Sequence, residues 1–302
     1  MAIATSQQIV NYYDLYRDKE IVFSKEILHS LRVDPRQIYV KCNGGQWPCI
    51  INSTSFQMAK IIIGTKGGAF QEITKRDAPT IQLRYCFIDP DNTPVIFFVS
   101  GKMSNVTPYM NSQDLAIVTI SFTQRPPDDL IVKIGSLIEA SVNSVNRRED
   151  RIVITPVSLR KLNIEREETI IYVQGVPRRC ILRDLSFCGA KVILLGLVKF
   201  LTQKEIILRI SFMDPVETID IKGTIVAAEA IEGRQDIAAV GIHFDESQIP
   251  INYKLHINSY LTTSRKTFIE LSEQQNMAQE AAREQPVPTT AGKPAAAESA
   301  AR

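Results

Sequence analysis

The sequence predicts a mainly β protein made of two tandem small antiparallel β-barrels, with flanking helices and a disordered C-terminal tail. Two observations support this prediction. Short β-rich runs separated by turn residues extend from Gln37 to Phe244, and the two halves of the chain share sequence in register. A chain of 302 residues is long enough for two domains, each with its own hydrophobic core.

The first half starts with a helical pattern at residues 6–17 and an apolar segment at residues 20–31 whose type the pattern leaves open. Six runs then predict strands, at residues 38–41, 49–52, 59–63, 80–88, 95–99 and 115–122. Glycine pairs and an Asp-Pro-Asp sequence separate them as turns. Six short strands of this kind are typical of a small barrel or sandwich.

The second half shows the same pattern of short strands separated by turns. Strands are predicted at residues 152–157, 169–174, 179–185, 190–194, 205–212, 218–228 and 237–244. After them, apolar residues at helical spacing predict a long amphipathic helix that caps the barrel, namely Ile257, Tyr260, Leu261, Phe268 and Leu271. The last residues are mostly Ala, Pro and Thr, which predicts disorder over 283–302.

An internal duplication links the two halves. Cys49–Ile63 aligns with Cys180–Leu194 at an offset of 131 residues, and Gln113–Phe122 aligns with Gln235–Phe244 at an offset of 122. A repeat of this length indicates two copies of one domain rather than a solenoid.

Charge and hydropathy exclude several classes of protein. A net charge of +2 provides no broad basic stripe, which argues against a nucleic-acid partner. The N-terminal residues 1–10 lack the features of a secretory signal. The most apolar stretch, residues 190–201, is short and contains two lysines, so we expect no membrane insertion and a cytoplasmic location.

No constellation of residues indicates an enzyme, a cofactor or a metal. The five cysteines have no paired metal-ligand spacing and are expected to be reduced, buried thiols. The three histidines, His29, His243 and His256, are far apart in sequence and have no nucleophile beside them. Residues 64–68 are glycine-rich but lack the order of a Walker phosphate-binding loop.

Two polar clusters stand out against this background. Arg147 and Arg151, with Arg148 between them, provide planar forks that can bind a phosphate or a guanine edge bidentately. Asp184, Ser186 and Gly189 form the second cluster. The carboxylate of Asp184 could accept the N1 and N2 protons of a guanine, and Ser186 can donate or accept a hydrogen bond and favours a turn. Gly189 lets the backbone come close to a ligand or adopt positive φ.

Arg-x-x-x-Arg followed by Asp-x-Ser-x-x-Gly resembles the signature of the PilZ family, bacterial receptors for cyclic di-GMP, and the whole chain is similar to the two-domain PilZ proteins of spirochaetes. The resemblance implies that Arg147 and Arg151, with Arg148 as a neighbouring candidate, contact phosphate and guanine. It also implies that Asp184 and Ser186 hydrogen-bond guanine and that Gly189 shapes the turn. PilZ sequences commonly have Gly where this chain has Cys188, which makes the turn bulkier.

The resemblance implies a division into four parts. Residues 1–140 are expected to be a degenerate N-terminal PilZ-like domain, 141–151 an arginine-bearing linker, 152–282 the C-terminal PilZ domain with its terminal helix, and 283–302 the tail. In the first copy, Ser53 and Met58 replace Asp184 and Gly189, and only a serine persists, so this copy is interpreted as having lost the site.

The polar segment 139–150 is interpreted as a hinge that the ligand orders, so that binding selects one domain orientation. The predicted function is that of a non-catalytic cyclic di-GMP receptor that signals to an unidentified protein partner, with flagellar or other motility machinery as the candidate. Two alternatives remain open: a PilZ-like protein-interaction module that binds no nucleotide, and a single-stranded nucleic-acid binder. The second needs a groove of positive charge and aromatic residues, which this sequence lacks.

Overall fold

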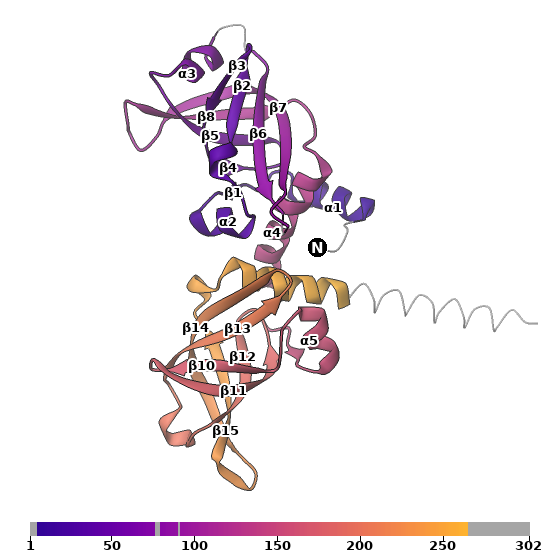
Figure 1. Ribbon diagram of the computed structural model, residues 1–302, viewed down its shortest axis with the longest axis vertical. Coiled ribbons are helices and arrows are strands. Elements are labelled where there is room, and N and C mark those ends of the chain that lie inside the picture. Colours follow the sequence, from indigo (N-terminus) through magenta and orange to yellow (C-terminus); the bar gives the residue numbers. More distant parts are fainter. Residues whose placement is uncertain (1–4, 76–78, 90, 265–302) are drawn as a thin grey trace, which may run out of the picture. The chain divides into compact units, whose positions relative to one another are not determined.

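The computed structural model describes residues 5–75, 79–89 and 91–264, and the chain is mainly β over these residues (Figure 1). The predicted mainly β fold class is confirmed, with one closed six-stranded antiparallel barrel and a second antiparallel sheet. Phe268 and Leu271 of the predicted terminal helix, and the predicted disordered tail at 283–302, lie outside the described residues.

The first domain contains one eight-stranded antiparallel sheet in the order β1-β4-β5-β8-β7-β6-β2-β3. Its helices are α1 (Ser6–Tyr16), α2 (Lys25–Ser30), the 3-10 turn η1 (Pro35–Gln37) and α3 (Gly68–Ile73). Its strands are β1 (Ile21–Val22), β2 (Tyr39–Cys42), β3 (Gly45–Pro48), β4 (Ile50–Thr54), β5 (Met58–Gly64), β6 (Ile81–Ile88), β7 (Pro94–Pro108) and β8 (Leu115–Phe122).

The second domain is a closed six-stranded barrel, because β10 pairs with both β13 and β11. Its strands are β9 (Ile152–Val153), β10 (Glu168–Val173), β11 (Val176–Leu185), β12 (Gly189–Leu195), β13 (Glu205–Met213), β14 (Val216–Ile231) and β15 (Arg234–Phe244). Helix α5 (Pro156–Leu162), the 3-10 turns η2 (Val198–Phe200) and η3 (Glu246–Gln248), and a helix at residues 251–264 complete it.

Strand alternation fills the barrel core. Along β13, Ile206, Leu208, Ile210 and Phe212 are buried while their neighbours are partly or fully exposed. Successive side chains of a strand point to opposite faces, so this period of two places four large apolar groups inside the barrel.

Two predictions near the start of the second domain are wrong. The predicted strand at 152–157 ends at Val153, because Thr155 and Ser158 form a capping box and Pro156 occupies the first turn of α5. The predicted polar hinge at 139–150 is helical as far as Asn146, since helix α4 spans Asp128–Asn146 and buries an apolar face.

The structural repeat begins upstream of Cys49 and Cys180, where the aligned sequence segments start. β1 pairs with β4 through Val22 and Ser53, and β9 pairs with β11 through Val153 and Asp184. Each short strand is followed by a capped helix, α2 or α5. The second domain has one continuous strand, β11, where the first has β3 and β4 interrupted at Cys49.

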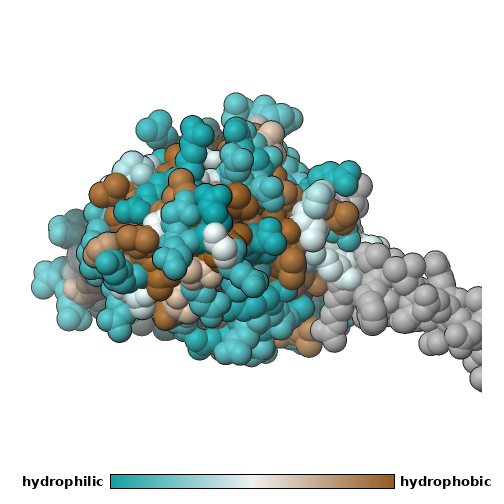
Figure 2. Space-filling model, turned by 90° about the horizontal axis from the view of Figure 1, so that it is seen from below, coloured by the Kyte–Doolittle hydropathy of each residue, from teal (hydrophilic) through white to brown (hydrophobic). Residues whose placement is uncertain are grey.

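All five cysteines are free thiols, as predicted, and four of them are buried while Cys188 is partly exposed. On the face shown in Figure 2, hydrophobic side chains are interspersed with hydrophilic ones. None of the helices in the described part of the chain has the length and apolar character required to cross a membrane.

Candidate ligand-binding site

The arginine segment, residues 147–151, reaches the barrel of the second domain through the two-residue strand β9. Helix α4 ends at Asn146, and the backbone N–H of Arg147 donates to the carbonyl of Asn143 at 2.8 Å. Strand β9 begins at Ile152 and adds to the edge of β11, with Val153 opposite Asp184. Backbone pairing therefore brings the end of the first polar cluster beside the start of the second.

Arg151 and Asp184 form the contact between the two clusters. Nη1 of Arg151 lies 2.6 Å from Oδ1 of Asp184, and their side chains are 56% and 16% exposed. Asp184 follows a register shift in the pairing of β11 with β12, and such bulges re-aim the side chains that follow them. The structure thus places a solvent-accessible guanidinium against a largely covered carboxylate.

The other two arginines also face carboxylates. Nε of Arg147 lies 2.7 Å from Oδ2 of Asp150, and Nη2 of Arg148 lies 2.5 Å from Oε1 of Glu246. An exposed guanidinium fork can bind phosphate oxygens, and a carboxylate can accept the paired N–H donors of a guanine. The cluster therefore carries the groups needed for a ligand that has both phosphate and guanine.

Ser186 lies in the turn between β11 and β12, and its hydroxyl is buried there. The residue is 1% exposed, its N–H donates to Gly189 O at 2.8 Å, and its Oγ donates to the same oxygen at 3.2 Å. Its carbonyl accepts a hydrogen bond from the hydroxyl of Tyr253 at 2.7 Å. Burial raises the pKa of Tyr253 far above its ordinary value, which keeps this hydroxyl protonated as a donor.

Gly189 is required for a reason that differs from both predicted ones. It is not among the glycines with positive φ in the described residues. An added Cβ would lie 2.4 Å from the carbonyl oxygen of Ile242 on the neighbouring strand β15. A side chain at this position would therefore collide with the barrel's own backbone.

Cys188 ties the turn to the arginine segment. Its Sγ donates to the carbonyl of Arg148 at 3.0 Å, and its own carbonyl accepts the N–H of Phe244 at 2.8 Å. The side chain that distinguishes this turn from the common PilZ pattern thus contacts the backbone of Arg148.

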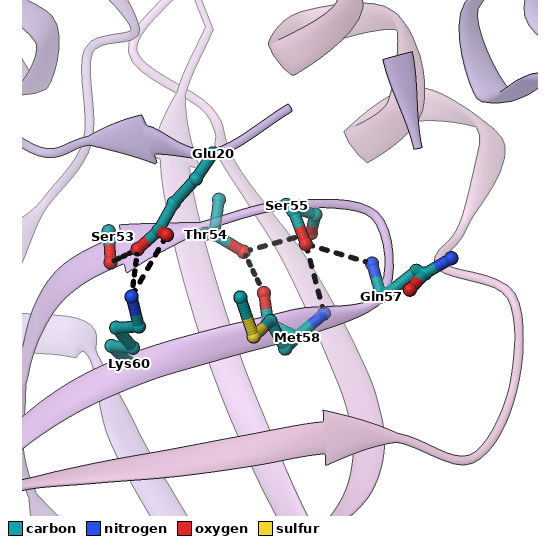
Figure 3. Close-up of polar contacts among 7 residues, drawn as sticks. All are labelled: Glu20, Ser53, Thr54, Ser55, Gln57, Met58 and Lys60. Atoms are coloured by element: carbon teal, nitrogen blue, oxygen red, sulfur yellow. Dashed lines mark hydrogen bonds and ion pairs between the residues drawn. The ribbon is translucent and has the colours of Figure 1, made fainter. Parts of the chain in front are cut away.

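The first domain preserves the turn and replaces the charges (Figure 3). Ser55 N–H donates to Met58 O at 2.8 Å, as Ser186 does to Gly189. The first domain has Glu20 and Ser53 where the second has an arginine and an aspartate. Glu20 accepts a hydrogen bond from the hydroxyl of Ser53 and forms an ion pair with Lys60, whose Nζ lies 2.9 Å from Oε2.

Glu20 is charged at the position where the second domain has Arg151. Partial burial alone would raise its pKa, but hydrogen bonds from Lys60 and Ser53 outweigh burial and hold the pKa below its usual value. Because a carboxylate repels phosphate oxygens, this position in the first domain is unsuited to the anion that Arg151 could bind.

Two site features were missed from the sequence. The upstream repeat could have been found, because Tyr16–Val22 aligns with Arg147–Val153 at the same offset of 131. The proximity of Glu246 to Arg148 had no sequence signal, since 98 positions separate them. Within the described residues, no group of three or more His, Cys, Asp or Glu side chains could hold a metal ion.

Family models match both halves of the chain: a PilZN3 domain at residues 7–141 and a PilZ domain at residues 146–262. A cyclic di-GMP binding protein of Treponema denticola is 44% identical over 268 residues, which cover 88% of this chain and 85% of that protein. The chain belongs to the PilZ family. The match to the PilZ domain contains the arginine segment, the turn and Glu246.

Solved structures of other proteins also align with the chain. The PlzA protein of Borreliella burgdorferi in complex with c-di-GMP is 25% identical, with a TM-score of 0.38, and the alignment covers 84% of this chain and 98% of that one. YcgR from Escherichia coli in complex with c-di-GMP is 14% identical, with a TM-score of 0.23 and coverage of 92% and 100%.

Proposed function

We propose that this PilZ protein is a receptor for cyclic di-GMP that binds the dinucleotide on its second domain and does not turn it over. The observation that carries the proposal is the contact of Arg151 with Asp184, a guanidinium and a carboxylate at 2.6 Å on the barrel edge. Cyclic di-GMP combines phosphates with guanines, and these two side chains complement both groups. The Treponema denticola relative, named a cyclic di-GMP binding protein, supports the same ligand.

The site residues have distinct roles in this proposal. Arg147, Arg148 and Arg151 bind phosphate and the guanine edge, and Asp184 accepts the guanine N–H groups. The Arg151–Asp184 ion pair must open for the ligand to enter. Ser186 and Gly189 hold the turn that presents Asp184, because the hydroxyl of Ser186 is buried and already bonded.

The signalling output is the finer part of the proposal. Ligand phosphates that engage the arginines would shift the residues between α4 and β9, and this shift would select one orientation of the two domains. A protein partner, with motility machinery as the candidate, would read that orientation. Small-angle X-ray scattering with and without cyclic di-GMP tests this part, and identical scattering curves at saturation would contradict it.

Binding itself is tested by calorimetric titration of the purified full-length protein with cyclic di-GMP, with GTP as the control ligand. Arg147→Ala and Arg151→Ala should each weaken binding by about 1.5–3 kcal/mol, the usual contribution of a charged hydrogen bond. Arg166→Ala is a matched control, because Arg166 pairs with the adjacent Glu165 instead of with a site residue. A folded wild-type protein that releases no heat would contradict the receptor proposal and favour a protein-interaction module.

A further inference from the structure

Each arginine of the site is already paired with a carboxylate. Arg147 pairs with Asp150, Arg151 with Asp184 and Arg148 with Glu246. The three carboxylates differ in origin. Asp150 belongs to the arginine segment itself, and Asp184 is proposed to bind guanine. Glu246 belongs to neither motif and has no role in the proposed binding mode.

Barrel pairing places Glu246 beside the turn. β15 runs alongside β12, with His243 opposite Gly189, and the N–H of Phe244 donates to Cys188 O at 2.8 Å. Glu246 follows two residues later, at the start of η3. The end of β15 is therefore anchored to the residues that shape the site.

Arg148 is held near the same turn by a hydrogen bond to its backbone carbonyl. The thiol of Cys188 donates to the carbonyl of Arg148 at 3.0 Å, which fixes the backbone of the arginine segment. With both backbones anchored, Nη2 of Arg148 reaches Oε1 of Glu246 at 2.5 Å. The ion pair is thus set by the fold of the second domain rather than by a local contact in sequence.

The Arg148–Glu246 pair is accessible to a ligand. The two side chains are 45% and 52% exposed. Exposed ion pairs are weak, so a phosphate can displace the carboxylate. Nε2 of His243 also lies near Glu246, 3.7 Å from the same Oε1.

We propose that Glu246 is a competing counter-ion that sets the affinity for cyclic di-GMP by occupying Arg148 in the free protein. This inference rests on the proposed function of the site. A carboxylate paired with Arg148 weakens ligand binding because this ion pair must be broken before a phosphate can take the guanidinium. Removing the charge while keeping the shape should therefore tighten binding.

The test is calorimetric titration of full-length Glu246→Gln with cyclic di-GMP. We expect binding to tighten about two- to fivefold, which corresponds to the free energy of an exposed ion pair. A structural defect would weaken binding, so the direction of the change separates competition from damage. Glu165→Gln is the matched control: it removes one exposed carboxylate that pairs with Arg166 at 2.6 Å, and it should leave affinity unchanged.

A second pair of variants tests whether the effect passes through Arg148. In an Arg148→Ala background, Glu246→Gln should have no effect, because the contested group is absent. Protein concentrations are chosen so that binding a hundredfold weaker remains measurable. Unchanged or weaker binding by Glu246→Gln, or tightening that persists in the Arg148→Ala background, would overturn the inference. Absence of binding by the wild-type protein would instead overturn the receptor proposal itself.

Discussion

Glu20 in the first domain occupies the position that Arg151 occupies in the second. Each residue immediately precedes a two-residue strand, β1 or β9, whose second residue pairs with Ser53 or Asp184 respectively. The duplicated fold therefore holds an anion in one copy and a cation in the other. The two copies therefore differ in charge at equivalent positions of the fold.

Replacing Arg151 and Asp184 with the residues that the first domain has at the equivalent positions should abolish binding without preventing folding. We expect the double variant Arg151→Glu with Asp184→Ser to fold, because the first domain accommodates these residues beside Lys60, and Lys191 takes the equivalent position opposite Asp184. Its free energy of unfolding should change by less than about 1 kcal/mol, while cyclic di-GMP binding should be lost. Chemical denaturation and calorimetry measure the two effects.

The exchange has a matched control in the same barrel. Arg209 and Asp220 form another Arg–Asp pair, between β13 and β14, with Nε 2.8 Å from Oδ1. Arg209→Glu with Asp220→Ser should leave binding intact. Equal loss of binding in both double variants would show that net charge, and not the site pair, is responsible.

Gly189→Ala should destabilise the second domain. The new Cβ would meet Ile242 O at 2.4 Å, and overpacking of this kind costs about 1–3 kcal/mol. Gly241→Ala is the control on the neighbouring strand, because its Cβ would lie 3.6 Å from Cβ of Ala227, an ordinary contact. Urea denaturation compares the two variants, and equal stabilities would refute this account of Gly189.

Tyr253→Phe should destabilise the turn that presents Asp184. The substitution removes the hydroxyl that donates to Ser186 O at 2.7 Å and leaves a buried carbonyl without this partner. An unsatisfied buried acceptor costs about 1–3 kcal/mol. Urea denaturation should show that loss, and cyclic di-GMP should bind more weakly because the turn is less well held. A variant with wild-type stability would argue that the carbonyl finds another donor.

Glu20 should make the stability of the first domain depend on pH. Its pKa in the folded protein is below its ordinary value of 4.5, so its stabilising effect is fully present above pH 4.5 and is lost as pH falls through the lower folded-state pKa. The difference in unfolding free energy between wild type and Glu20→Gln should therefore be largest above that pH and shrink below it. A difference that stays constant with pH would contradict the Glu20–Lys60–Ser53 arrangement.

The fold class, the duplication and the residues of the two polar clusters could be predicted from the sequence alone. These features are encoded locally. Strand alternation such as that of β13, turn residues, and the spacing of Arg147 and Arg151 can each be read without knowing what lies across the barrel. The capping box at Thr155 was also local, but the apolar run at 152–157 obscured it.

The contacts of each site residue depend on the tertiary structure. The pairing of β9 with β11 brings Arg151 to Asp184, and the packing of β15 against β12 makes Gly189 essential and carries Glu246 to Arg148. These relationships depend on which strands are neighbours and in which register. Strand pairing joins residues that are distant in sequence, and a shift of one residue would turn each side chain to the other face. No local pattern contains that information.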